Sequence, residues 1–377
     1  MGGGNDIKID RYVREVGSGL NDRHKQLNKL LRDPSCQRIV AEHRETSGAF
    51  RGAGLLQQTM NIPYVVGMDM VSFMQRFSTD EACRAFLEQV RWPDGPVCPK
   101  CGSVRRASRV TSRPGTWGCC VGSCKAQFSV TAGTPLHRTR VPLTKWFLAI
   151  WLISTSSKGV SGMKLAEWLD VDYRTAWYMG HRIRRLLSDP DWRKLSGVVE
   201  ADEMYVGGPK KPEDDDPGAG SGGSKRGRGH GRATVLVAAE RGGDVRVQRI
   251  ATHSSIEIGS AVRELIDPSA QLVTDGLPAY RQIGRSMAGH VTINHGQRRF
   301  SDGSGGHINT AEGFIGLFRR SVQGTWHWVS RKHLDAYTTE CTWRHNRRDV
   351  SAARKFIQAL GGLDAGPLGY RELVACG

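Results

Sequence analysis

Long hydrophobic runs are missing from this chain of 377 residues, and no apolar stretch approaches the roughly 20 residues that a membrane-spanning helix needs. The opening Met-Gly-Gly-Gly does not begin a signal peptide, and Asp6 stands where a myristoylation signal would carry Ser or Thr. Acidic residues are also scarce: 37 Asp and Glu face 54 Lys and Arg, for a formal net charge of +17. We therefore expect a cytoplasmic protein without membrane contact whose partner is a polyanion, most simply nucleic acid.

Cysteine is sparse outside one segment, because five of the nine cysteines fall within residues 98–124. They are Cys98, Cys101, Cys119, Cys120 and Cys124. Two groups of thiolates separated by a short hairpin suit a tetrahedral structural Zn²⁺ better than a disulfide framework. The first group has the regular two-residue spacing, whereas the second offers either Cys119 or Cys120 beside Cys124. The sequence predicts a zinc ribbon, with four thiolates that close the metal shell.

Two short helices are expected after the ribbon, joined by a turn at residues 170–172. A helix, a short turn and a second helix with a polar start are typical of a DNA-reading helix-turn-helix, although a plain helical hairpin explains the apolar positions equally well. In the DNA-binding interpretation, Arg174 and Thr175 face bases. The residues expected to meet phosphates are Arg182, Arg184 and Arg185.

The sequence GVVEADEMYVGG, residues 197–208, combines a β-branched run with three acids and a Gly-Gly turn. Acids are unusual at the end of a core strand, so the strand is expected to deliver a carboxylate to the mouth of a site. Strand alternation places Glu200 and Asp202 on one face and Glu203 on the other. Asp202 is the favoured site residue, Glu200 supports it at most indirectly, and Glu203 points away.

Further acids follow at the starts and ends of later elements. Asp275 ends a short apolar strand, and Asn309 and Glu312 lie one turn apart at the start of a helix. The predicted order of elements is three antiparallel strands, a helix, a strand, a helix, a strand and a final helix. This order suits an α/β (α+β) domain of the ribonuclease-H-like fold. If the acids converge, they would hold Mg²⁺ or Mn²⁺, which prefer oxygen ligands. The alternative is that they serve only as helix caps and turn formers.

Several motifs together resemble the insertion-sequence transposases of the fifteen-ninety-five (ISXO2-like) family. They are CPKCG, QFSVTAGTPLHRTRVPLTKWFLAIWLI, TAWYMGHRIRRLL, ADEMYVGG, VTDGLPAY and HINTAEGFIGLFRRSVQGTWHWVS. The resemblance covers roughly residues 70–348 and implies a zinc ribbon, a helix-turn-helix that binds terminal inverted repeats, and a DDE catalytic domain. By motif, Asp202 and Asp275 are the first two metal ligands. The third is Asn309 or Glu312, and Arg319 stands where the family commonly has a lysine.

The expected order of domains follows from these motifs. It is a basic extension over 1–66, a helical adaptor over 67–96, a zinc ribbon over 97–133, a helix-turn-helix region over 134–195, a ribonuclease-H-like domain over 196–350 with a flexible insertion at 206–232, and a tail over 351–377. The role of the first segment is not inherited from the resemblance.

The predicted function is that of a bacterial DNA transposase that cuts and joins strands with Mg²⁺ and carries a structural Zn²⁺. Its partners are double-stranded DNA and at least one more copy of the chain, since two ends must be paired. Two other hypotheses stay open. One is a DNA-binding regulator with an inactive nuclease-like domain, and the other is a ribonuclease-H-type nuclease without strand transfer.

Overall fold

The computed structural model describes residues 68–187, 189, 192–207, 233–252, 254–293 and 307–375. The expected N-terminal extension and nearly all of the expected insertion at 206–232 lie outside this part of the chain. Across the described residues, no helix is long and apolar enough to cross a membrane.

Two helices open the described chain, α3 (Met70–Arg76) and α4 (Asp80–Arg91). The Thr79 side chain accepts a hydrogen bond from the Ala82 amide at 3.2 Å, and Asp80 and Glu81 lie in the first turn of α4. The hydroxyl cap satisfies a free backbone amide, and the two acids lie at the positive end of the helix dipole, so both features stabilise this N-terminus.

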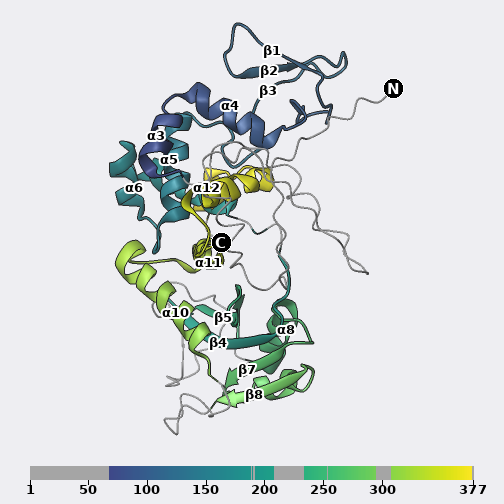
Figure 1. Cartoon of the computed structure of the whole chain (residues 1–377), viewed down its shortest axis with the longest axis vertical. Helices are drawn as coiled ribbons and strands as arrows, with labels where there is room; N and C mark the ends of the chain where they lie inside the picture. Colours follow the sequence, from purple (N-terminus) through teal and green to yellow (C-terminus); the bar gives the residue numbers. More distant parts are fainter. Residues whose placement is uncertain are drawn as a thin grey trace, which may run out of the picture.

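The ribbon is a three-stranded antiparallel sheet of β1 (Ala107–Arg109), β2 (Thr116–Cys119) and β3 (Gln127–Ser129). It lies at one end of the molecule, above α4 (Figure 1). Glu88 of α4 holds it there by accepting hydrogen bonds from the Arg109 guanidinium at 2.7 Å and from the Trp117 indole at 3.0 Å.

The central layer is helical and contains α5 (Leu143–Thr155), α6 (Gly162–Leu169) and α7 (Tyr173–Leu186). The turn between α6 and α7 ends α6 with Asp170 in the left-handed conformation, and the Asp172 side chain caps α7. The pair is two helices joined by a short turn, which is common to a DNA-reading helix-turn-helix and to a plain helical hairpin.

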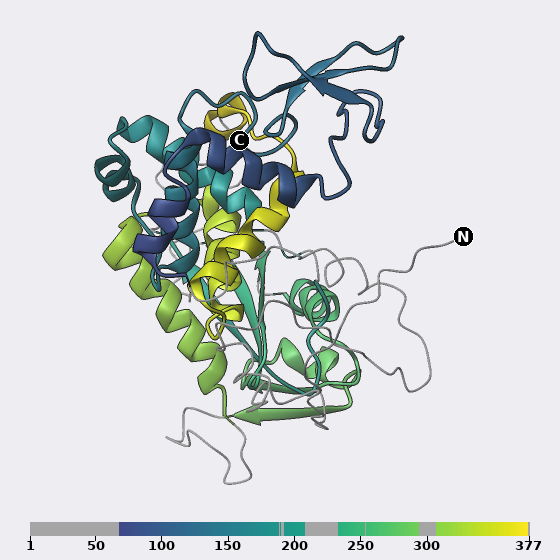
Figure 2. The same ribbon diagram turned by 45° about the horizontal axis from the view of Figure 1, so that its top comes forward.

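The C-terminal segment returns to this central layer. Helix α12 (Ala352–Leu360) packs on α5, and Phe356 is fully buried among Phe73, Phe77 and Phe147. Figure 2 shows α12 in yellow among the N-terminal helices. A short 3-10 helix (Gly361–Ala365) and α13 (Tyr370–Val374) follow. The C-terminal segment thus contributes buried side chains to the helical core.

Replacing Phe356 with Ala should lower the free energy of unfolding by about 3–5 kcal/mol, because it removes a fully buried ring from an aromatic cluster. Urea unfolding followed by circular dichroism measures the change. Trp328→Ala is the control, since that side chain is 68% exposed and its loss should alter stability by no more than about 0.5 kcal/mol. A loss below about 1 kcal/mol for Phe356→Ala would show that α12 is dispensable for the core.

The second body is a mixed five-stranded sheet in the order β6-β5-β4-β7-β8. Its strands are β4 (Val198–Val206), β5 (Ala233–Glu240), β6 (Val245–Ile250), β7 (Gln271–Asp275) and β8 (Gly289–Ile293). β4, β5 and β6 are antiparallel, whereas β7 runs parallel to β4 and to β8. This is the mixed sheet predicted from the order of elements, and its fold class is ribonuclease-H-like.

Helices cover both faces of this sheet (Figure 2). On one face, α8 (Ser255–Leu265) and α9 (Tyr280–Gly284) pack against the odd-numbered side chains of β4, such as Val199 and Ala201. On the other face, α10 (Asn309–Ser321) and α11 (Leu334–Asn346) pack against Met204 and Val206. Between α10 and α11 the chain forms a π-helical turn (Val322–Trp326) and a 3-10 turn (Arg331–His333).

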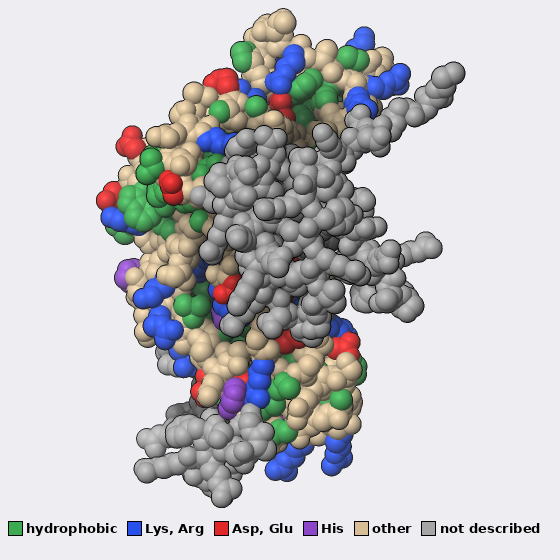
Figure 3. Space-filling model, viewed as in Figure 1, with side chains coloured by type: hydrophobic (Ala, Val, Ile, Leu, Met, Phe, Trp, Pro, Cys, Tyr) green, Lys and Arg blue, Asp and Glu red, His purple; other side chains and the backbone are tan. Residues whose placement is uncertain are grey.

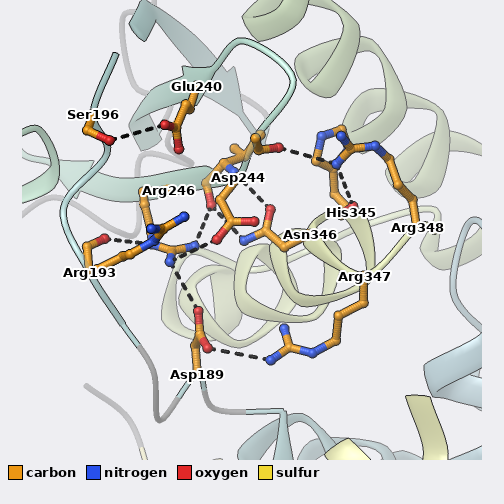
Figure 4. Close-up of polar contacts among 12 residues, drawn as sticks. Asp189, Arg193, Ser196, Glu240, Asp244, Arg246, His345, Asn346, Arg347 and Arg348 are labelled. Carbon is orange, nitrogen blue, oxygen red and sulfur yellow. Dashed lines mark hydrogen bonds and ion pairs between the residues drawn. The ribbon is translucent and has the colours of Figure 1, made fainter. Parts of the chain in front are cut away.

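Polar contacts join the β5–β6 hairpin to the end of α11 and to the connection before β4 (Figure 4). Asn346 exchanges two hydrogen bonds with the backbone of Val245, at 2.8 and 3.0 Å. Asp189, in the connection before β4, pairs with Arg246 at 3.2 Å and with Arg347 at 3.5 Å. These contacts fix three parts of the chain to one another beside the sheet.

Candidate active site and zinc site

Asp202 and Asp275 lie beside each other on the neighbouring strands β4 and β7. The parallel register of β4 and β7 pairs Ala201 with Thr274, and each aspartate comes one residue further along its strand. Neighbouring strands are about 4.8 Å apart, so the register brings the two backbones close. Val273 packs with Ile308, which precedes α10, and alternation gives Asp275 the same side of the sheet as Val273.

Glu312 approaches from the covering helix. It lies in the first turn of α10, the helix that packs over β4 and β5. Burial, with added repulsion from the charges of Asp275 and Glu312, raises the pKa of Asp202 to about 6, and Arg319 acts in the opposite direction. The charges of the predicted residues Asp275, Glu312 and Arg319 thus all act on the fourth predicted residue, Asp202. Asn309 begins the same helix.

Each aspartate also has a local backbone contact. Asp202 Oδ1 accepts a hydrogen bond from the Glu203 amide at 2.8 Å, and Asp275 Oδ1 accepts one from the Leu277 amide at 3.0 Å. The second contact is the turn-forming role considered for an Asp-Gly pair. It occupies one carboxylate oxygen and fixes the side chain at the strand end, so the turn role and a site role are compatible.

The start of α10 differs from the expected capping motif. Neither Asn309 nor Thr310 caps the helix from within, because its N-cap is Ile308, which forms no side-chain cap. Glu200 of β4 accepts hydrogen bonds from the amides of Thr310 and Ala311 instead, at 2.7 and 3.1 Å. A carboxylate from a neighbouring strand therefore takes the place that the helix's own side chain was expected to fill.

Glu203 occupies the opposite face of the sheet, as alternation predicts, but it is not an outward bystander. Its carboxylate accepts a hydrogen bond from the hydroxyl of Tyr280, a fully buried residue of α9. Burial and the charge of Glu203 raise the pKa of Tyr280 well above its usual value. Glu203 is therefore part of the packing between the sheet and α9.

The cysteine site is formed by Cys98, Cys101, Cys119 and Cys124, whose sulfur atoms all lie within 4.8 Å of one another. Cys98 Sγ is 3.7 Å from Cys124 Sγ, and Cys101 Sγ is 3.7 Å from Cys119 Sγ. Within the described ranges this is the one group of three or more His, Cys, Asp or Glu residues gathered so closely. Four sulfurs at this separation fit a tetrahedral structural Zn²⁺.

Cys120 stays outside the cysteine site. It is exposed, and its sulfur contacts the Ser108 hydroxyl at 3.6 Å and the Gly118 carbonyl at 3.8 Å. Adjacent residues of an extended strand point in opposite directions, so when Cys119 at the end of β2 faces the other thiols, Cys120 cannot. The two alternatives in the sequence are separated by this geometry. Hydrogen bonds from Ser103 lower the pKa of Cys101 to about 6.

The predicted phosphate contacts of α7 are wrong for two of three arginines. Arg182 is 5% exposed and donates to the backbone carbonyls of Pro135 and His137. Arg184 is also 5% exposed, and its Nε donates to Glu340 of α11 at 2.7 Å. These guanidinium groups connect elements inside the protein, so they cannot reach DNA. Arg185 is partly exposed and donates to the Ala365 carbonyl at 3.0 Å.

At the N-terminus of α7, the structure places the two predicted base-reading residues differently. Arg174 is exposed. Thr175 is half-buried, and its hydroxyl and amide both donate to the capping carboxylate of Asp172. The Thr175 side chain therefore has a capping role, whereas Arg174 keeps an open position for a partner.

Fold and sites together define a zinc-ribbon protein with a ribonuclease-H-like domain. Residues 194–346 match the ISXO2-like transposase domain, and residues 78–127 match the transposase zinc-ribbon domain. The chain is 31% identical over 263 residues to a protein in transposable element ISH50 of Halobacterium salinarum, covering 66% of this chain and 84% of that one. The chain therefore belongs to the ISXO2-like transposase family.

Other similarities are more distant. A transposase-like protein of Haemophilus influenzae is 25% identical over 99 residues, which cover 26% of this chain and 78% of that protein. Among solved structures, the Mos1 mariner paired end complex with Mn aligns with a TM-score of 0.25 and 12% identity, covering 54% of this chain and 71% of that one. A pre-cleavage Mos1 transpososome aligns with a TM-score of 0.23 and 11% identity, covering 58% and 78%.

Proposed function

We propose that this protein is the transposase of a bacterial insertion sequence, which binds terminal inverted repeats and catalyses Mg²⁺-dependent cleavage and transfer of DNA strands. The observation that carries the proposal is the placement of Asp202, in the middle of β4, beside Asp275, which ends the neighbouring parallel strand β7, on the face that α10 covers with Glu312. Paired acids on adjacent parallel strands are suited to positioning cations beside a phosphodiester.

The residues present fit a hard divalent cation. All of the candidate ligands offer oxygen atoms, which hard divalent cations prefer, and the register of β4 and β7 places Asp202 beside Asp275. Mg²⁺ or Mn²⁺, when bound, would supply Lewis acidity and an activated oxygen nucleophile for in-line phosphoryl displacement. For the third ligand, Glu312 contributes charge, whereas Asn309 could contribute a neutral amide oxygen. We favour Glu312 and keep Asn309 as the alternative.

The protein's own groups would do the remaining work. Asp202 and Asp275 would hold the cation from two hydrogen-bonded neighbouring strands, and Glu312 would complete the ligand set from α10. Arg319 is exposed two turns further along α10, where its guanidinium can bind a DNA phosphate next to the cleaved bond. Blue Lys and Arg side chains gather over the ribbon and along the edge where α10 lies (Figure 3), as a polyanionic substrate requires.

The helix pair α6–α7 would recognise the DNA ends of the element. Arg174 is the candidate for reading bases, and Arg185 is the candidate for a phosphate contact. The ribbon's structural Zn²⁺, held by Cys98, Cys101, Cys119 and Cys124, orders a second basic surface. The protein would act as at least a dimer on DNA, because the two ends of the element must be joined in one reaction.

A strand-transfer assay tests this function. The reaction contains purified protein, a target plasmid and a duplex that carries the inverted repeat flanking the reading frame. It should give joined DNA molecules when Mg²⁺ is present and none when EDTA is added. Gel electrophoresis separates the joined from the cut DNA. Cut ends without joined products would indicate a nuclease. Specific binding of the repeat without cleavage would indicate a regulator, and either result would reject the proposed transposase.

A further inference from the structure

Glu200 is a fully buried carboxylate at the boundary between β4 and α10. It lies two residues before Asp202 on the same strand and on the same face of the sheet. An ionised side chain out of contact with water is costly unless several partners stabilise its charge. The partners of Glu200 therefore indicate what the residue does.

All of its described partners belong to two neighbouring segments. From the start of α10, Glu200 accepts the amides of Thr310 and Ala311, at 2.7 and 3.1 Å, and the Thr310 hydroxyl at 3.0 Å. His307 Nδ1 is 3.1 Å from its Oε1. From the β5–β6 hairpin, Arg241 Nε donates to Oε1 at 2.7 Å.

Arg241 also donates to the His307 carbonyl at 2.7 Å, so the guanidinium spans from the carboxylate to the residue that leads into α10. The hairpin, β4 and the start of α10 are thereby fixed to one another through one charged group. Because α10 has no side-chain cap of its own, Glu200 satisfies amides that would otherwise stay open and adds a negative charge at the positive end of the helix dipole.

We propose that Glu200 is a positioning residue that sets the place of α10, and hence of Glu312, relative to Asp202. This inference rests on the proposed metal-dependent function. One carboxylate connects the strand that bears the first acid with the helix that bears the third, so a change at Glu200 alters the spacing of the cation's ligands without touching any of them.

Glu200→Gln is the matching test, because the amide keeps the size of the side chain while losing its charge and one acceptor oxygen. Its NH₂ group must face either the donors of α10 or the Arg241 guanidinium. Groups that orient metal ligands typically change metal affinity about 10–100-fold when replaced. We expect Mn²⁺ affinity of the full chain, measured by electron paramagnetic resonance of free Mn²⁺, to fall within that range.

Hydrogen exchange provides a readout that does not require metal. Amides at the start of α10 should exchange faster in Glu200→Gln than in the wild type, while those of α8 should be unchanged. Glu340→Gln is the matched control, because Glu340 is equally buried and pairs with Arg184 and Arg344 but belongs to α11. That variant should lose thermal stability and keep wild-type Mn²⁺ affinity.

Unchanged Mn²⁺ affinity and unchanged exchange in a folded Glu200→Gln protein would overturn the inference. Equal losses of affinity in Glu200→Gln and Glu340→Gln would also overturn it, because the effect would then be general destabilisation. If Glu200→Gln does not fold, Thr310→Val decides the question by removing only the 3.0 Å hydroxyl contact. It should bind Mn²⁺ several-fold more weakly, and wild-type affinity would count against the proposal.

A wild-type protein that binds no Mn²⁺ would reject the proposed function itself. The exchange rates at the start of α10 would then still determine whether Glu200 positions this helix. The two failures are therefore distinguishable.

Discussion

Asp202→Asn should reduce strand cleavage and strand transfer by about 1,000-fold or more while the protein still binds terminal-repeat DNA. The reason is electrostatic: Asn has the shape of Asp but cannot contribute negative charge to a divalent cation bound beside β4. Each tenfold decrease in rate corresponds to about 1.4 kcal/mol of lost transition-state stabilisation, so the expected decrease of about 1,000-fold corresponds to a loss of several kcal/mol. Single-turnover cleavage of labelled duplex and a gel-shift titration measure the two activities separately.

Asp267→Asn is the control for this experiment. Asp267 belongs to the same domain, and its carboxylate makes exposed hydrogen bonds to Ser269 at 2.9 and 2.6 Å. The same assay applied to Asn309→Ala and Glu312→Gln identifies the third ligand, since only the true ligand should match the loss seen for Asp202. Full cleavage and transfer activity in Asp202→Asn would reject Asp202 as a ligand of the catalytic cation and with it the proposed active site.

The second large effect is expected in the ribbon, where Cys98→Ser should abolish zinc binding and unfold residues around β1–β3. Binding of structural Zn²⁺ contributes about 10–16 kcal/mol of apparent free energy in small metal-dependent domains. The small ribbon sheet has a limited apolar core, mainly Phe128 and Val130, so it has little other source of stability. Limited proteolysis and metal analysis by mass spectrometry would report the loss.

Cys120→Ser is a close control, because this thiol directly follows the ligand Cys119 but lies outside the group of four sulfurs. It should retain one equivalent of Zn²⁺ and the protease resistance of the wild type. If Cys98→Ser also retained both properties, the ribbon would fold without metal. If Cys120→Ser lost them, the assignment of Cys119 as the ligand would be incorrect.

Local periodicity in the sequence was enough to predict the elements that carry the candidate active site. The two-residue repeat of β4 separates Glu200 and Asp202 from Glu203, and the strand that ends at Asp275 is short, apolar and followed by Gly. Thr79 and the acids after it similarly determine where α4 begins. In each case the deciding interaction lies within a few residues of the chain.

The predictions from sequence that were wrong or incomplete concern charged side chains whose partners are distant in the sequence. Arg184 has the spacing of an exposed helical arginine, yet its partner Glu340 is 156 residues away. Glu200 had only an indirect role in the sequence interpretation, because its donors at Thr310 and Ala311 are 110 and 111 residues away. Local pattern cannot show which charges a fold will bury, since that depends on which elements meet.

The return of α12 to the first helices has a consequence for synthesis of the protein. The aromatic core that includes Phe73 and Phe147 is completed only by Phe356, near the end of the chain. A ribosome would release that segment after the whole sheet domain had emerged. Nascent or prematurely ended chains would therefore lack a finished helical layer.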